Sequence, residues 1–286
     1  MIVIVGSIIV IGAVLGGFSM AGGHVGALIV PSEFVTIGGA ALGALIVGSP
    51  KKVLIDLAKG MLATLKGSPF GKPAYEELFK CLYDLLRLAR RDGMLALESH
   101  ISNPHGSAIF EKYPRIGKNH HVVAFICGGM GPMIEATAKP EQLAELLDAE
   151  LKVMAEEHHA PLSALTKCAD ALPGFGIVAA VLGIVVTMGH IDGPPAEIGH
   201  HVGAALVGTF LGILLSYGFA APLVVRMEFL GLAEAAFFRT ITTIIVGFAK
   251  NQPPKVAIDM ARRGMPSELR PERVQLDQWF KEAEAA

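Results

Sequence analysis

Adjacent histidines are the groups best suited to proton or metal chemistry in this 286-residue sequence. They form three pairs: His120–His121, His158–His159 and His200–His201. Neighbouring residues do not share a helix face, so a pair alone is a poor metal site. The third pair has another histidine and two acids close by in the sequence, His190, Asp192 and Glu197. Three interpretations stay open for this segment: a metal site, a solvated loop, or a place that collects protons near neutral pH.

Motifs for nucleotide binding and hydrolysis are missing. The segment Gly67–Lys72, GSPFGK, is one residue short of a phosphate-binding loop, and Pro73 follows it instead of Ser or Thr. No GxSxG or HExxH motif occurs. The three cysteines form no CxxC, which argues against a disulfide framework and a thiolate zinc site. We therefore expect neither an enzyme activity nor a cofactor.

Composition indicates a membrane protein. Hydrophobic residues make up 52% of the chain and charged residues only 17%, with a mean hydropathy of +0.52. Soluble domains carry about 25% charged residues. The net charge of −2 at pH 7 argues against a nucleic-acid-binding protein.

The distribution of positive charge predicts the topology. All 24 Lys and Arg residues lie in two blocks, Lys51–Lys167 and Arg226–Lys281. Residues 1–50 and 171–225, outside these blocks, hold four apolar segments of about the 20 residues needed to span a membrane: 1–21, about 34–50, about 171–191 and 202–225. Since positive loops stay inside, both termini and both charged blocks are expected in the cytoplasm, and 22–33 and 192–201 outside.

We therefore predict an all-α polytopic membrane protein with four transmembrane helices and a helical cytoplasmic domain. The predicted parts are a hairpin at 1–50, a cytoplasmic domain at 51–170, a second hairpin at 171–225 and a cytoplasmic tail at 226–286. Apolar residues at helical spacing predict two cytoplasmic helices: Leu78, Leu82, Leu85 and Ala89 on one, and Leu143, Leu147, Leu151 and Met154 on the other. We expect Pro140 and Pro161 to bound the second of these.

The predicted spans contain no Asp, Glu, Lys or Arg. Ionisable groups within a membrane mark ion pathways, so a proton path here needs a carboxylate from another chain. Pro173 and Pro222 lie near the cytoplasmic ends of the third and fourth predicted spans, at similar predicted depths. Each proline is interpreted as either a static bend in its helix or a hinge.

Two further patterns have open interpretations. Glycines spaced four apart allow close helix packing, within this chain or between copies of it: Gly12/Gly16, Gly39/Gly43 and Gly208/Gly212. A charged cluster in the cytoplasmic domain is either a solvated face or a docking surface: Arg87, Arg90, Arg91 and Glu98.

Several segments together resemble the flagellar motor stator A subunits, the MotA family. They are VGSIIVIGAVLGGF, GGHVGALIVPSEFVTIGGAALGALI, LLRLARRDGMLALESH, ALPGFGIVAAVLGIV and VGTFLGILLSYGFAAPL. The resemblance implies a proton-driven stator in the bacterial inner membrane. It implies five A subunits around two B subunits, and each B subunit (MotB-like) has one span, a proton-carrying Asp and a peptidoglycan-binding domain.

The resemblance also implies roles for particular residues. Arg90 and Glu98 match the pair that engages the rotor protein FliG, and Pro173 and Pro222 match prolines linked to torque generation. Thr209 and Tyr217 lie on the fourth span, which lines the ion path in this family. Sodium-type stators carry Thr where this chain has Ala180 and Gly208, so the resemblance implies protons as the coupling ion. It assigns no role to His190, His200 or His201.

Two other functions stay open. Energy-transducing subunits of the ExbB/TolQ type are related, but they have three spans and an outside N-terminus, whereas the charge pattern here predicts four spans and an inside N-terminus. The second is an intramembrane enzyme or a passive scaffold. The lack of ionisable groups in the predicted spans argues against the enzyme.

Overall fold

The computed structural model describes residues 2–285, and every regular element within that range is a helix. The expected all-α class is confirmed. In chain order the elements are α1 Ile2–Met20, η1 Val25–Leu28, α2 Pro31–Val47, α3 Lys51–Lys66, α4 Lys72–Asp92, η2 Met94–Leu97, α5 Glu98–Ser102, η3 Pro104–Gly106, α6 Ala108–Lys112, α7 Pro114–Gly117, α8 His120–Ile134, α9 Pro140–Met188, α10 Pro195–Ile213, the π-helix η4 Leu214–Ala220, α11 Ala221–Ala249, α12 Pro254–Arg263 and α13 Arg273–Ala285.

Packing divides the chain into two compact units, each described by itself. The first comprises Met1–Gly67 and Glu157–Leu230, and the second comprises Ser68–Glu156 and Gly231–Ala286. Helices α9 and α11 contribute residues to both. The boundaries expected at residues 50, 170 and 225 concern the sides of a membrane, which packing does not test, so they stay predictions.

Four helical stretches in the described part of the chain are long and apolar enough to span a membrane. They are Ile2–Met20, Val25–Val47 and parts of Pro140–Met188 and Pro195–Ala249. Helix α1 has no buried residue, and the side chains of Ile2 and Ile8 are 74% and 64% exposed. Apolar surface of this extent is stable in lipid or against another protein, not in water. The prediction of four spans is confirmed.

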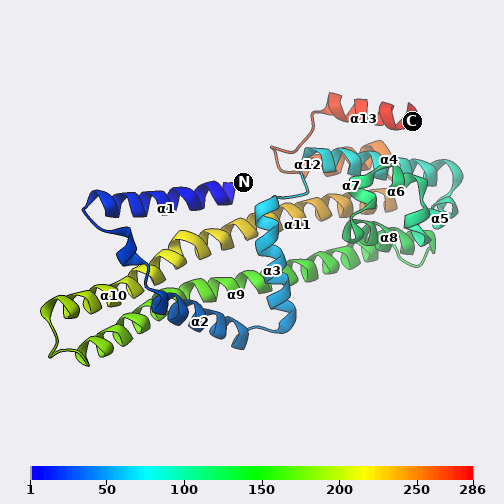
Figure 1. Ribbon diagram of the computed structural model, residues 1–286. Coiled ribbons are helices and arrows are strands. Elements are labelled where there is room, and N and C mark those ends of the chain that lie inside the picture. Colours follow the sequence, from blue (N-terminus) through cyan, green and yellow to red (C-terminus); the bar gives the residue numbers. More distant parts are fainter. Residues whose placement is uncertain (1, 286) are drawn as a thin grey trace. The chain divides into compact units, whose positions relative to one another are not determined.

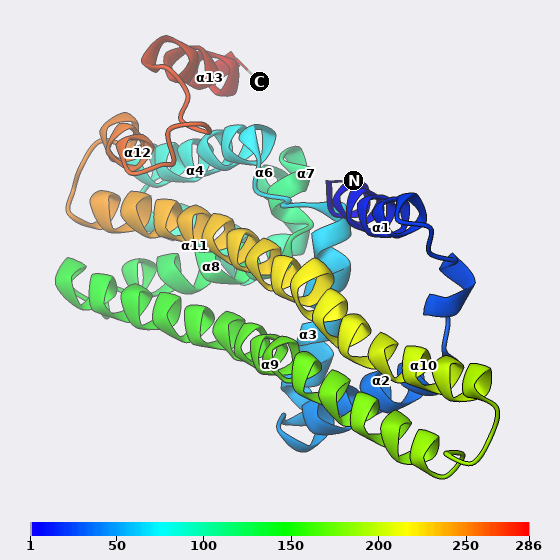
Figure 2. The same cartoon turned by 90° about the vertical axis from the view of Figure 1, so that its left-hand side faces the viewer.

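Three of these helices form the centre of the first unit. Helices α9 and α10 run antiparallel beside each other, joined by a short loop, and α2 packs against them (Figures 1 and 2). The buried side chains at this contact are Ile37, Ala41, Leu172, Ala179 and Leu211. Within lipid, the hydrophobic effect does not drive helices together, so their association depends on the close approach of their backbones. Small residues at the contact allow this approach.

Helix α9 corrects one expected boundary. It begins at Pro140 as predicted but continues through Pro161 to Met188. Pro161 removes one backbone hydrogen bond from the helix. Leu162 and Leu165, directly after this proline, are buried with Leu57 and Met227, so packing fixes the helix in place of the lost bond.

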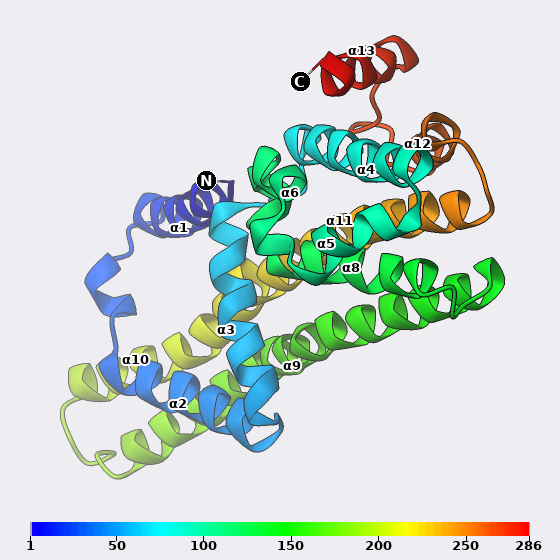
Figure 3. The same cartoon turned by 90° about the vertical axis from the view of Figure 1, so that its right-hand side faces the viewer.

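The second unit is built around α4, which packs against η2, α6, α7, α12 and α13. Figure 3 shows α4 with α6 and α12 on either side of it. The predicted apolar stripe is confirmed, since Leu78, Leu82, Leu85 and Ala89 are all buried. Rings from distant segments meet on it: the Phe70 and Phe237 centroids are 4.7 Å apart, and those of Phe125 and Phe238 are 5.0 Å apart. Offset and edge-on ring contacts of this kind add stability beyond area burial.

Helix α13 docks on α4 through charges and rings. Lys80 Nζ lies 2.6 Å from a carboxylate oxygen of Glu282, and the Tyr83 hydroxyl donates to Glu284. The rings of Tyr83 and Phe280 are 4.6 Å apart, and the buried Trp279 has its ring 6.3 Å from that of Phe79. The end of the predicted tail is therefore part of the second unit's core.

Candidate functional site

The crossing of α9 and α10 is built from glycines. A side chain on Gly176 would begin 2.8 Å from the carbonyl oxygen of Gly208 and 3.2 Å from the Cα of Gly212. A side chain on Gly183 would begin 2.6 Å from the Cβ of Ala205. The spacing of Gly208 and Gly212 therefore serves packing within the chain. Around the other glycine pairs the space is open, namely Gly12, Gly16, Gly39 and Gly43.

Glu33 corrects the expectation that the spans lack acidic residues. Helix α2 begins at Pro31, three residues before the predicted start of the span, which places Glu33 in its first turn. The side chain is only 6% exposed, and its Oε2 has no hydrogen-bond partner among the described residues. The sequence held a signal for this, because Pro followed by an acid in the first turn is typical of a helix start.

The carboxyl of Glu33 fills the space that Gly208 leaves empty. Its Oε2 lies where a side chain on Gly208 would begin. From that same position the Cβ of Ala179 is 3.1 Å away and the backbone nitrogen of Ala180 is 3.2 Å away. Three helices, α2, α9 and α10, thus meet at one buried acid.

Pro173 and Thr209 lie near this crossing. A side chain on Gly212 would begin 2.6 Å from the carbonyl oxygen of Leu172, so Pro173 is level with the end of α10. The Cα of Thr209 is 3.4 Å from the Cβ position of Gly176. Helix α9 runs through Pro173 without a break. Other span hydroxyls are used within their own helices: Thr36 donates to Ser32 and Thr187 to Gly183.

Pro222 and Tyr217 lie further along, at the irregular turn. Residues Leu214–Ala220 form a π-helix that ends two residues before Pro222. Such wide turns bend helices and recur at functional sites. The side chain of Tyr217 is 68% exposed. Pro222 follows Ile213 by nine residues, and seven of these nine residues form the π-helix. The two prolines are therefore not level along the hairpin, and their depth in a membrane stays a prediction.

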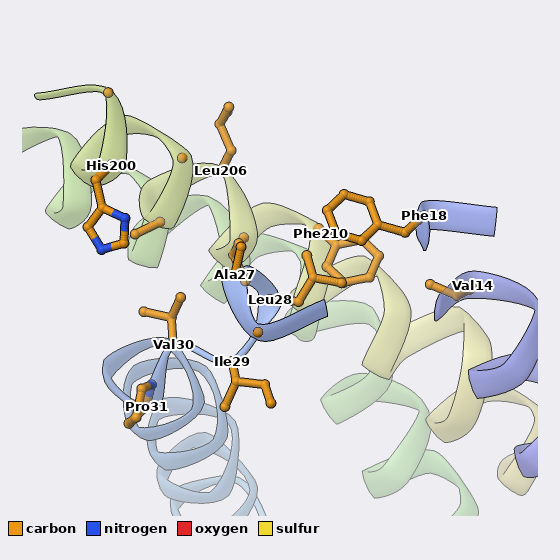
Figure 4. Close-up of a pocket in the computed structure, with 15 residues that line it drawn as sticks. Val14, Phe18, Ala27, Leu28, Ile29, Val30, Pro31, His200, Leu206 and Phe210 are labelled. Carbon is orange, nitrogen blue, oxygen red and sulfur yellow. The ribbon is translucent and has the colours of Figure 1, made fainter. Parts of the chain in front are cut away.

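A histidine of the loop between α9 and α10 stacks on a histidine of α10. The rings of His190 and His201 are 5.1 Å apart at 25° to each other, and His190 Nδ1 lies 2.9 Å from the carbonyl oxygen of Val186. Within the described range, no three His, Cys, Asp or Glu side chains are arranged to hold a metal ion. A cavity of about 760 Å³ lies beside α10, with Gly199 and His200 in its lining. Its walls come from α1, η1, α2 and α10, and His200 is its titratable group (Figure 4).

The charged cluster lies at a corner of the second unit, around the turn at Gly93, where φ is +90°. Arg90 and Glu98 are both exposed, the first near the end of α4 and the second at the start of α5. Arg90 Nη1 donates to Asn251 Oδ1 at 3.1 Å. Arg91 pairs with Asp92 at 2.7 Å, and this hydrogen bond lowers the pKa of the Asp92 carboxyl. Arg90 thus presents its charge at the surface without an acidic partner within 4.0 Å in residues 2–285.

Comparison with known proteins gives consistent matches over the whole chain. The family described as Motility protein A N-terminal matches residues 4–93, and the MotA/TolQ/ExbB proton channel family matches 118–230. The chain is 38% identical to the chemotaxis protein LafT of Vibrio parahaemolyticus, covering 98% of both proteins. It is 36% identical to motility protein A of Salmonella typhimurium, over 97% of this chain and 94% of that one. A solved structure of MotAB from C. jejuni matches with a TM-score of 0.78 and 20% identity, over 95% of this chain and 98% of that one.

Proposed function

This chain belongs to the motility protein A family, within the wider MotA/TolQ/ExbB proton channel family, and we propose how it converts ion flow into torque. It is a stator subunit of the flagellar motor in the bacterial inner membrane, coupling proton flow to torque on the rotor. The observation that carries this conclusion is the match over nearly the full length to motility proteins. The four candidate spans of the described residues also fit this branch and not the three-span ExbB/TolQ type.

The proposed assembly is a ring of several copies, five in number, around two single-span B subunits. Exposed apolar side chains on α9 and α10 support it, because the hairpin needs lipid or protein on these faces: Ile177, Val181, Val185, Leu206 and Ile213. The B subunit would contribute the proton-carrying Asp. Both termini of this chain would lie in the cytoplasm.

The proposed coupling uses the irregular geometry of the hairpin. One charge crossing 100 mV releases about 2.3 kcal/mol, roughly four times thermal energy. Neutralising an Asp on the partner helix changes how that helix packs against α9 and α10. Thr209 would border the ion path, as would Tyr217, and Pro173 and Pro222 would allow the helices to bend.

The proposed rotor contact is the exposed pair Arg90 and Glu98, facing charged residues of FliG. Their support is geometric, since a rigid, buried stripe of α4 holds Arg90 at the surface of the second unit. No metal or cofactor enters this proposal, because the transported ion supplies the energy.

Deleting the gene in a flagellated host tests the function. We expect cells that assemble flagella but do not swim, and restoration of swimming by the plasmid-borne gene. Normal swimming of the deletion strain, in a host with no second stator set, would contradict the proposal. Loss of the flagella themselves would also contradict it.

A further inference from the structure

Glu33 is the one charged residue in the buried class among the side chains that the structure describes. The other buried polar residues are the neutral Thr64, Ser107, Thr187, Ser216, Thr240 and Thr242. A buried charge ordinarily has an ion pair or several hydrogen bonds. The Oε2 atom of Glu33 has neither within the described residues, so its position needs another explanation.

Helix capping does not explain it. Glu33 lies in the first turn of α2, where the helix dipole favours a negative charge. A capping carboxylate accepts from free backbone N–H groups of that turn. Here Oε2 accepts no such bond and points instead at the bare backbone of Gly208 on α10.

The surroundings of the Oε2 atom of this carboxyl are apolar and tightly packed. Ala179 and Ala180 of α9 and Gly208 of α10 leave a space that the carboxyl fills. Ile37, one turn further along α2, is fully buried. A negative charge here would have to draw in water or move out of the space, whereas a protonated carboxyl fits as it stands.

A cavity lies beside residues that are close to this acid in the chain. The cavity is lined by Val30 and Pro31, three and two residues before Glu33, and by Val207, next to Gly208. Figure 4 shows His200 at the same cavity as Val30 and Pro31. Water in this cavity would give the carboxyl access to protons from the side of the α9–α10 loop.

We propose that Glu33 is a proton-binding site of the membrane unit, in which uptake of a proton locks α2 against α9 and α10 at Gly208. The carboxylate takes one proton from a hydronium ion, which is left as water: one O–H bond of the hydronium ion breaks, one O–H bond forms on the carboxyl, and the acid becomes neutral. Release of the proton restores the charge and loosens the contact of α2 with α10. The proposal adds a second carboxyl to the proton-coupling function proposed above and so rests on it for its role, but the site itself can be measured without a motor.

Infrared difference spectroscopy of the full-length chain in lipid nanodiscs, recorded between acid and alkaline pH, tests the site. The carbonyl stretch of a protonated carboxyl without hydrogen bonds stands apart from those of exposed acids. We expect this band in the wild-type protein and its loss in Glu33→Gln, a neutral variant of nearly the same shape. Identical spectra of these two proteins would overturn the proposal.

A matched pair on α10 separates the site from general effects of substitution. A methyl group on Gly208 would collide with Oε2, whereas one on Gly203 has open space around it. Gly208→Ala should therefore shift or abolish the band, and Gly203→Ala should leave it unchanged. The same response of the two alanine variants would overturn the proposal.

The motor experiment and the spectra fail independently. A missing band together with a non-swimming deletion strain refutes the site and leaves the stator function intact. A band that depends on Glu33, together with a deletion strain that swims, supports the site and refutes the function.

Discussion

Replacing Gly176 by Ala tests whether the α9–α10 crossing sets the stability of the membrane unit. The new methyl would begin 2.8 Å from the carbonyl oxygen of Gly208, while ordinary contacts begin at 3.4 Å. The helices would have to separate by about 0.6 Å, the difference between these distances. All three neighbours of this position are backbone atoms of α10, so no side chain can rotate away.

The expected loss of stability follows from this separation of the two helices. A gap of about 0.5–1 Å forfeits a quarter to a half of each dispersion contact. Overpacking of this kind costs about 1–3 kcal/mol in the free energy of unfolding. At about 2–4 °C per kcal/mol, Gly176→Ala should lower the melting temperature by about 2–12 °C.

Gly174 supplies the matched control, two residues away on the same helix. A methyl group there has no neighbour within 4 Å, and Ala is favoured over Gly in a helix by about 0.5–1 kcal/mol. Thermal unfolding of both variants in nanodiscs, followed by helical circular dichroism, measures the difference. A Gly176→Ala protein that melts at or above the Gly174→Ala protein would refute the packing argument.

Three further outcomes are expected. Arg90→Glu should reduce swimming without affecting membrane insertion. Lys118→Glu, which reverses an exposed charge elsewhere on the second unit, should leave swimming unchanged. The loss in Arg90→Glu should be partial, because a single exposed ion pair contributes only about 0.2–1 kcal/mol, and equal swimming of both variants would contradict the rotor contact. Lys80 lowers the pKa of the Glu282 carboxyl, and the Tyr83 hydroxyl lowers the pKa of the Glu284 carboxyl. The two carboxylates therefore stabilise docked α13 at any pH above about 4.3, the pKa of an unfolded Glu. This contribution is lost as the pH falls through the lowered pKa values of the folded protein. Fluorescence of Trp279, the single tryptophan, should report release of α13 at a pH below about 4, and a spectrum unchanged down to global unfolding would contradict this. Proteoliposomes holding this chain alone should show no potential-driven proton uptake above the lipid background, because Glu33 lies in the first turn of its helix and no second acid is buried among residues 2–285. Robust uptake would show a complete path within the chain.

The helical elements could largely be predicted from the sequence, since hydropathy and periodicity act locally. The stripe on α4 is an example, because Leu78, Leu82 and Leu85 recur at the spacing of one helix face. Pro161 shows the limit of such rules. A proline signals a helix end, but buried leucines after it hold α9 together through tertiary contacts that no local pattern records.

The candidate site was less accessible to sequence reasoning, because it depends on how helices cross. Gly208 was predicted as a packing glycine, yet nothing local reveals that the space beside it is filled by Glu33 from α2. A boundary placed three residues too late removed that acid from the span. The unequal levels of Pro173 and Pro222 follow from the register of α9 on α10, which depends on contacts such as Leu172 with Gly212.

The choice of coupling ion depends on that same crossing. Sodium must replace part of its hydration shell with several oxygen ligands, and sodium-type stators resemble this chain but carry Thr where Ala180 and Gly208 stand. Both positions border the carboxyl of Glu33, and a threonine at position 208 would occupy the space of Oε2.

We therefore expect a proton-driven motor. Swimming speed should not respond to external sodium at fixed pH and should collapse when a protonophore is added. Gly208→Thr should impair swimming without creating a sodium response, because its side chain displaces Glu33 before any ion shell can form, while Gly203→Thr serves as the control in open space. A speed that rises steeply with sodium and survives the protonophore would show that oxygen ligands come from elsewhere, and that Ala180 and Gly208 do not decide the ion.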